Sequence, residues 1–198
     1  MQDALDSYDK ALRLAPDSAE AWSNRGLALN AMNRFDAALE SFGRALSLRP
    51  RFADAWCGQG AALQGAGEVE AAGDSYQRAL ECQPDHAEAL VNLASLMQRL
   101  HRHEDALMLA ERAVSLYPAN SAARLRLANA LNALGRQEQA VVAYRAAREC
   151  GADDTLCSYM LAALGAEPAP ASAPPAYVQA LFDQYAGHFD EHLEQVLG

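Results

Sequence analysis

The chain has 198 residues, of which 51% are hydrophobic and 21% are charged, a composition typical of a protein that buries apolar surface. Its formal net charge is −10 and Lys10 is the only lysine, so neither nucleic acid nor an anionic membrane is expected as a partner. No run of about 18 apolar residues and no basic-then-apolar leader occurs, which argues against a membrane span and a secretory signal. We expect a cytoplasmic protein. The chain has four cysteines, Cys57, Cys82, Cys150 and Cys157. None are paired as C-x-x-C, so we expect them to be reduced and to hold no metal.

The first predicted element is a helix over residues 2–14. Its Ala4, Tyr8 and Ala11 match the second helix of the repeats that follow, but the first helix of that pair is missing. Residues 1–18 are therefore interpreted as a partial unit. Such a beginning is expected of a chain cut from a longer array, or of a start codon that lies inside one.

Full helical repeats follow at a constant spacing. Prolines stand at positions 16, 50, 84 and 118, and the length of this constant step is typical of helix-pair repeats. The units predicted from this step align without a gap and cover 19–52, 53–86, 87–120 and 121–154. The small aligned residues are Gly26, Gly60, Ala94 and Ala128; Ala38, Ala72, Ala106 and Ala140; and Ala45, Ala79, Ala113 and Ala147. The large ones are Trp22, Trp56 and Leu90; Leu29, Leu63, Met97 and Leu131; and Phe42, Tyr76 and Tyr144.

Packing accounts for this pattern. Two antiparallel helices approach closely only where their side chains are small, and large side chains fill the space on either side. At the turn within a pair, Gly67 and Gly135 can take the positive φ that a helix end often needs, and Asn33 tolerates it. Each proline is expected to end a second helix because it lacks an amide donor and clashes with the turn before it. We therefore predict an all-α fold.

Over roughly residues 1–154 the pattern resembles the tetratricopeptide repeat (TPR) family. The chain departs from the family where Arg25 and Gln59 replace the usual leucine, and where Arg124 and Ala152 replace the aromatic residue and the proline of the last unit. The resemblance implies a right-handed superhelical solenoid of antiparallel helix pairs that holds a peptide or protein segment in a concave groove. The groove residues that it implies are Asn24, Leu27, Asn30, Cys57, Ala61, Gln64, Asn92, Ser95, Gln98, Arg126, Asn129 and Asn132.

Asparagines suggest how such a groove would bind. An asparagine both donates and accepts, so a series of them can hold the backbone of an extended peptide without reading its sequence. Asn24 and Asn92 occupy the position where repeats of some protein glycosyltransferases carry an asparagine ladder, but Gly58 and Arg126 interrupt it. The alternative is that these residues are solvated polar side chains. A groove of the chaperone type, which binds a carboxylate through lysines, is not supported.

After the repeats, a capping helix is predicted at 153–164, a Pro/Ala-rich linker at 165–175 and an amphipathic helix within 176–198. No metal site is predicted. His188, Glu191 and His192 fit the H-x-x-E-H pattern of some zinc peptidases, but no third ligand follows, and a short pattern of this kind arises easily by chance. His101 and His103 are interpreted as turn and helix-surface residues.

Residues 177–198 resemble the opening of the catalytic domain in bacterial TPR-containing methyltransferases that use S-adenosylmethionine. The matching residues are Tyr177, Val178, Leu181, Phe182, Asp183, Tyr185, Ala186, Phe189, Asp190, His192, Leu193, Leu197 and Gly198. No strand followed by a Gly-rich turn occurs, so we expect neither catalysis nor a cofactor in this chain, and S-adenosylmethionine only in a longer parent protein.

The leading hypothesis is thus a scaffold that binds a protein or peptide and forms the N-terminal recognition part of a methyltransferase. The alternatives are a free-standing TPR adaptor or assembly factor, and the TPR arm of a protein glycosyltransferase. Self-association through exposed terminal helices is a further expectation.

Overall fold

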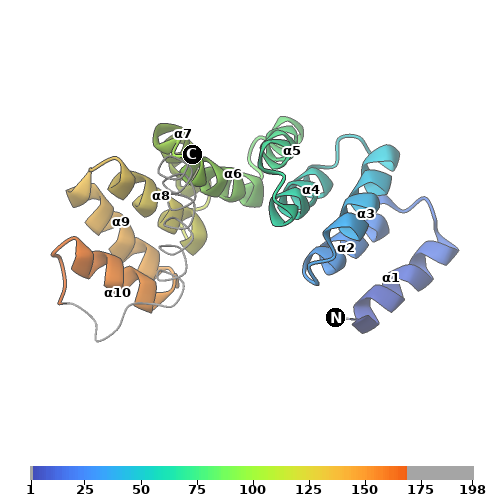
Figure 1. Cartoon of the computed structure of the whole chain (residues 1–198), viewed down its shortest axis with the longest axis horizontal. Coiled ribbons are helices and arrows are strands. Elements are labelled where there is room, and N and C mark those ends of the chain that lie inside the picture. The colour runs from blue at the N-terminus through green and yellow to red at the C-terminus, as the bar shows by residue number, and fades with distance from the viewer. Residues whose placement is uncertain (1, 169–198) are drawn as a thin grey trace, which may run out of the picture. The chain divides into compact units, whose positions relative to one another are not determined.

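The computed structural model describes residues 2–168, and the secondary structure of this part is entirely helical (Figure 1). The chain divides into two compact units, Met1–Pro118 and Ala119–Gly198. The predicted all-α fold is confirmed. The C-terminal amphipathic helix, and the predicted linker beyond residue 168, lie outside the described residues. The helices of the first unit are α1 (Gln2–Leu14), α2 (Ala19–Asn30), α3 (Phe35–Leu48), α4 (Ala53–Ala66), α5 (Val69–Cys82), α6 (Ala87–Arg99) and α7 (His103–Leu116). Those of the second are α8 (Ser121–Ala133), α9 (Gln137–Glu149) and α10 (Asp154–Ala163).

Consecutive helices pack in pairs: α2 with α3, α4 with α5, and α6 with α7 in the first unit, and α8 with α9 in the second. We call the members of each pair its first and second helix. Within the first unit, α2 also contacts α4, and α4 contacts α6, so the first helices of neighbouring pairs lie side by side. Helix α1 packs against α2, and α10 packs against α9.

The turn inside each pair reverses the chain through a residue with positive φ. The predicted positions Asn33, Gly67 and Gly135 have φ values of 57°, 89° and 71°, and His101 has 55°. In the second pair, the amide of Glu68 donates to the carbonyl of Leu63, a bond that closes the helix end. The predicted positive φ is therefore confirmed at all three positions.

The prolines end the second helices in a way that differs slightly from the prediction. Helix α3 stops at Leu48, two residues before Pro50, and Arg49 between them has φ −136° and ψ 89°. A residue before proline avoids the helical region because the proline ring clashes with its backbone. The proline therefore acts through its neighbour. In the last pair, where Ala152 replaces the proline, Gly151 ends α9 with φ 88°.

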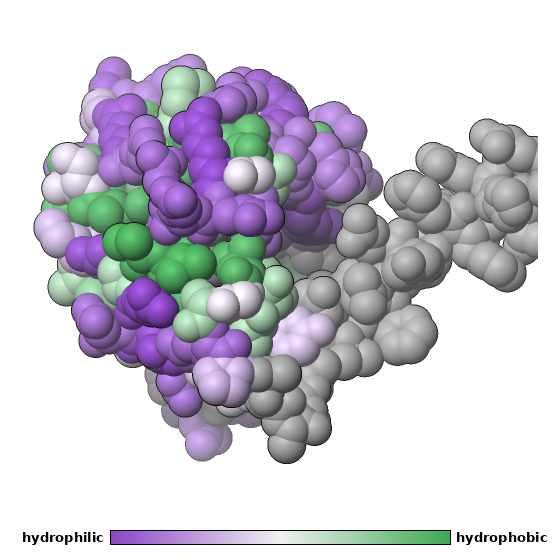
Figure 2. Space-filling model, turned by 90° about the vertical axis from the view of Figure 1, so that its left-hand side faces the viewer, coloured by the Kyte–Doolittle hydropathy of each residue, from purple (hydrophilic) through white to green (hydrophobic). Residues whose placement is uncertain are grey.

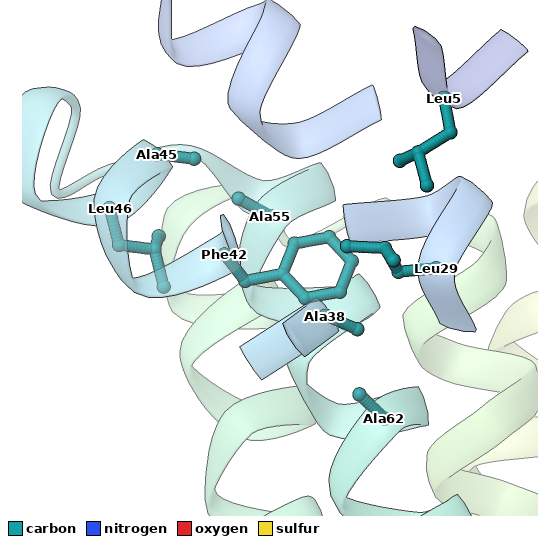
Figure 3. Packing of buried hydrophobic residues seen from close by; sticks show 8 residues of the cluster. All are labelled: Leu5, Leu29, Ala38, Phe42, Ala45, Leu46, Ala55 and Ala62. Atoms are coloured by element: carbon teal, nitrogen blue, oxygen red, sulfur yellow. The ribbon is translucent and has the colours of Figure 1, made fainter. Parts of the chain in front are cut away.

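Small residues let the helices pack around the aromatic ring of Phe42, as Figure 3 shows. Phe42 is 0% exposed. A Cβ atom placed on Gly26 of α2 would lie 2.8 Å from its ring, and one placed on Gly58 of α4 would lie 2.5 Å away. Since both distances are too short for real Cβ contacts, the two glycines create the space that the ring fills. The other residues shown in the cluster are Leu5, Leu29, Ala38, Ala45, Leu46, Ala55 and Ala62.

Helix α1 leaves one of its faces open. Ala4 and Ala11 are exposed, whereas Ala38 and Ala45, which occupy the aligned positions of the next unit, are 0% exposed. Helix α3 packs against α2, the first helix of its own pair. Among the described residues, α1 has no first helix of its own pair to cover this face.

Candidate protein-interaction site

The predicted groove residues all lie on first helices. Helix α2 carries Asn24, Leu27 and Asn30, and α4 carries Cys57, Ala61 and Gln64. Helix α6 carries Asn92, Ser95 and Gln98, and α8 carries Arg126, Asn129 and Asn132. We call the nine residues of α2, α4 and α6 the first-helix face of the first unit. The contacts of α4 with both α2 and α6 bring these nine onto neighbouring helices, and the other three belong to the second unit.

An exposed leucine lies among the amides of this face. Leu27 is 44% exposed, although the chain buries Leu29 on the same helix completely. Asn24 is exposed, and Ala61 and Gln64 on α4 are half-buried. The combination can offer an apolar contact to one side chain of a partner and hydrogen bonds to its backbone.

Cys57 is a buried member of this face. Its side chain is 2% exposed, and burial is the main reason that the pKa of its thiol rises to about 12. The Nδ2 atom of Asn92 lies 3.9 Å from its sulfur. The structure therefore does not present the Cys57 thiol to a partner, and its role on the face is structural.

The interrupted asparagine ladder has a steric cause at Gly58. Gly58 aligns with Asn24 and Asn92, but the ring of Phe42 occupies the space where its side chain would begin. Arg126 aligns with the same position in the second unit, and burial lowers the pKa of its guanidinium. The structure thus explains the glycine through the core rather than through a ligand.

Carboxylates stand at the start of the first helices, where the helix dipole favours negative charge. Glu20 bonds to Arg49, and this hydrogen bond is the main cause of the lowered pKa of the Glu20 carboxyl. Asp54 lies 2.9 Å from Nε2 of His86, whose Nδ1 accepts a hydrogen bond from the amide of Ala89. Because Nδ1 accepts, Nε2 is the nitrogen that donates to Asp54. Glu20 and Asp54 therefore serve the fold.

Three pockets lined by described residues lie away from the first-helix face. One, of about 530 Å³, is lined by Pro50, Arg51, Trp56, Asp74, Gln77, Arg78, Glu81 and Cys82. In it the guanidinium of Arg78 lies 4.9 Å from the Trp56 ring, and the indole N–H donates to the carbonyl of Pro50 at 2.9 Å. The two others lie at the turns around residues 33–37 and 135–139. The sequence prediction missed the Trp–Arg pair, which Trp22 and Arg44 repeat at a longer 5.8 Å.

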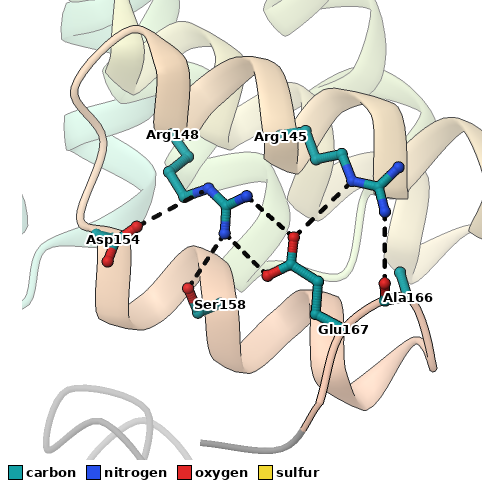
Figure 4. A network of polar contacts seen from close by, with 6 residues as sticks. All are labelled: Arg145, Arg148, Asp154, Ser158, Ala166 and Glu167. Atoms are coloured by element: carbon teal, nitrogen blue, oxygen red, sulfur yellow. Dashed lines mark hydrogen bonds and ion pairs between the residues drawn. The ribbon is translucent and has the colours of Figure 1, made fainter.

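At the end of the second unit, a polar network holds the chain beyond α10 against α9 (Figure 4). Arg148 donates to both carboxylate oxygens of Glu167, at 2.9 and 3.0 Å, and to Ser158 of α10 at 3.3 Å. Arg145 donates to the carbonyl of Ala166 at 3.4 Å. Residues 165–167, which open the predicted linker, are therefore fixed against the last helices.

Figure 2 faces the side on which α9 and α10 lie, and hydrophobic residues gather there in a patch bordered by hydrophilic ones. On α9, Val142 is 67% exposed. On α10, Leu156 and Met160 are half-buried. This apolar surface was not predicted from the sequence, because the exposed face of a capping helix depends on how that helix packs.

No metal or membrane chemistry is found in the described part of the chain. Among residues 2–168, no cluster of three or more His, Cys, Asp or Glu side chains could hold a metal ion. The H-x-x-E-H pattern at 188–192 lies outside this range. Within the same range, no helix has the length and apolar character that crossing a membrane requires. All four cysteines are free thiols.

Comparisons with known proteins agree with the geometry. Three models described as tetratricopeptide repeat match residues 19–52, 51–119 and 98–164, and a model of the protein prenyltransferase alpha subunit repeat matches 1–32. No curated protein matches the chain.

Among solved structures, two crystal structures of MamA share 25% identity with the chain. Their TM-scores are 0.65 and 0.63, and the alignments cover 74% of this chain and 85% and 80% of theirs. The crystal structure of YrrB, described as a TPR protein with an unusual peptide-binding site, shares 21% identity with a TM-score of 0.67, over 83% of this chain and 87% of YrrB. The likeness to YrrB shows the fold alone.

Proposed function

Since residues 19–164 form an array of tetratricopeptide repeats, we propose that this chain is a protein-interaction scaffold that binds an extended peptide or protein segment on its first-helix face. The observation that carries the proposal is the exposed Leu27 among Asn24, Asn30 and Gln64, on first helices that lie side by side. YrrB, a neighbour in fold, is described as having a peptide-binding site, which supports a peptide as the kind of partner.

The test is a selection of random displayed peptides on the whole chain, followed by affinity measurements on two variants. Leu27→Glu changes the first-helix face, and Met108→Glu is the matched control because Met108 is 62% exposed on α7, a second helix. We expect Leu27→Glu to weaken binding at least about tenfold, since a charge replaces an apolar contact, and Met108→Glu to change it less than about twofold. Circular dichroism checks that both variants fold. A larger loss in Met108→Glu would contradict the proposal.

We further propose that the array is the recognition part of a methyltransferase that uses S-adenosylmethionine. The support is the resemblance of residues 177–198 to the start of such catalytic domains, and these residues lie outside the described part. Reading the gene beyond the codon for Gly198 tests the proposal. A continuing frame with a strand and a Gly-rich turn is expected, and a stop codon there would favour a free-standing adaptor.

Two smaller proposals concern the setting of the protein. The free cysteines are typical of a reducing compartment, which favours the cytoplasm.

The open face of α1, with Ala4 and Ala11 exposed, favours self-association through this helix. Analytical ultracentrifugation of Ala11→Glu against the unchanged chain checks it: the variant is expected to sediment as a smaller species, and equal sedimentation would count against it.

A further inference from the structure

Buried tyrosine hydroxyls reach two amides of the first helices from below. The hydroxyl of Tyr76 on α5 donates to Oε1 of Gln64 on α4 at 3.1 Å. In the second unit, the hydroxyl of Tyr144 on α9 donates to Oδ1 of Asn129 on α8 at 2.7 Å. The two tyrosines are 1% and 0% exposed, so they contact the amides without being available to a partner themselves.

These bonds engage the oxygen end of each amide. A side-chain amide carries its acceptor oxygen and its NH2 donors on the same carbon, pointing in different directions. With the oxygen of Gln64 held by the hydroxyl of Tyr76, its NH2 group points away from that hydroxyl. Burial raises the pKa of Tyr76 and of Tyr144, so both hydroxyls keep their protons at neutral pH and remain donors.

The first pair provides an internal comparison. Phe42, which has no hydroxyl, occupies the position aligned with Tyr76, and Asn30 occupies the position aligned with Gln64. The Oδ1 atom of Asn30 is buried and has no hydrogen-bond partner. In this pair, the carbonyl oxygen at the position aligned with Gln64 is left without a hydrogen bond, and the aligned aromatic residue has no hydroxyl to donate one.

We propose that Tyr76 is a positioning residue, which holds Gln64 so that its NH2 group donates to a main-chain carbonyl oxygen of a polypeptide bound on the first-helix face. The inference rests on the proposed function and specifies it: at Gln64 the ligand is recognised by its backbone, through a donor on the protein. A hydroxyl that held the NH2 group instead would leave the carbonyl oxygen as the available acceptor, and this place would select an N–H group.

The first experiment needs no ligand. In the labelled protein, the side-chain carbonyl carbon of Gln64 reports whether its oxygen accepts a hydrogen bond, and its NH2 resonances report whether that group donates. In Tyr76→Phe we expect the carbonyl carbon to shift and the NH2 resonances to change little. A change confined to the NH2 resonances, or no change in either, would overturn the assignment.

The second experiment measures affinity for the peptide recovered in the selection described above. Tyr76→Phe is expected to weaken binding about threefold to tenfold, the range for one hydrogen bond, because Gln64 would no longer be held in the orientation that donates to the ligand. Tyr117→Phe is the matched control, because the Tyr117 hydroxyl also donates to a protein group, but this group is the backbone carbonyl of Asp85, which lies between α5 and α6.

The outcomes separate the two proposals. If the unchanged protein recovers no peptide, the proposed function fails, while the ligand-free experiment still decides whether Tyr76 orients Gln64. If peptide binds but Tyr76→Phe and Tyr117→Phe lose equal affinity, the positioning role is contradicted and the hydroxyls serve stability alone.

Discussion

Phe42 shows how one side chain sets both the packing and the surface of the first unit. Its ring is completely buried and lies against the backbones of two first helices, at Gly26 and Gly58. The same contact leaves no room for a side chain at Gly58 on the first-helix face, whereas the aligned residues of this unit, Asn24 and Asn92, are asparagines. A requirement of the core therefore takes precedence over a regular polar surface at this position.

Replacing Gly58 by alanine tests this account. The new Cβ would lie 2.5 Å from the Phe42 ring, which is too deeply buried to move aside, so we expect the free energy of unfolding to fall by roughly 1–3 kcal/mol. Urea denaturation measures it. Gly43→Ala on α3 is the control, because Gly43 is exposed with nothing within 4 Å of the added carbon, and it is expected to stabilise by about 0.5–1 kcal/mol. Equal stabilities of the two variants would contradict the role of the ring.

The sequence could predict which positions are small or large, but not which of them meet. Gly26 and Ala38 stand out because every repeat has a small residue at these positions, and Phe42 because two of the other three repeats have a tyrosine there. The contact of Phe42 with Gly58 joins two neighbouring repeats, and the bond from Tyr76 to Gln64 depends on side-chain direction. Neither leaves a periodic signal, so the cause of the broken asparagine ladder and the orientation of the amides needed coordinates.

At the scale of the helices, the end of the array is held differently from its interior. Leu46 and Leu80 occupy aligned positions on α3 and α5, and Leu46 is buried in the core. Arg148 occupies this position on α9, and instead of packing it bonds to Glu167 and Ser158. The change from leucine to arginine was a signal, visible in the sequence, that the last pair meets something other than another repeat.

The Arg148–Glu167 pair should make the attachment of α10 sensitive to acid. The hydrogen bond from Arg148 is the main cause of the lowered pKa of the Glu167 carboxyl. A carboxyl with a lowered folded pKa stabilises the folded state above its unfolded pKa, about 4.3, and this contribution is lost as the pH falls through the folded value. We expect Glu167→Gln to speed hydrogen exchange of the α10 amides at pH 6, and the difference from the unchanged protein to disappear towards about pH 3.

Glu149→Gln is the control for this experiment, since Glu149 is an exposed carboxylate on the same helix as Arg148. It should leave exchange of the α10 amides unchanged at both pH values. A difference between Glu167→Gln and the unchanged protein that persists at low pH would show that the effect does not come from the ionised pair.

For the whole molecule, the constant step between prolines predicted nearly all of the architecture of the described part. It works because each repeat packs mainly on its neighbours, so a pattern that repeats in the sequence also repeats in the contacts. The partner is not encoded in this way. Leu27 and the amides around it are the residues in which the repeats differ, and differences of this kind decide affinity without affecting the fold.

Our central proposal is that the partner binds to the first-helix face and not to the second helices. The most direct test is a titration of the labelled protein with the selected peptide, followed by two-dimensional amide spectra. We predict that the largest shifts fall on α2, α4 and α6, around Leu27 and Gln64. Shifts confined to α3, α5 and α7, or to the pocket lined by Trp56 and Arg78, would contradict it.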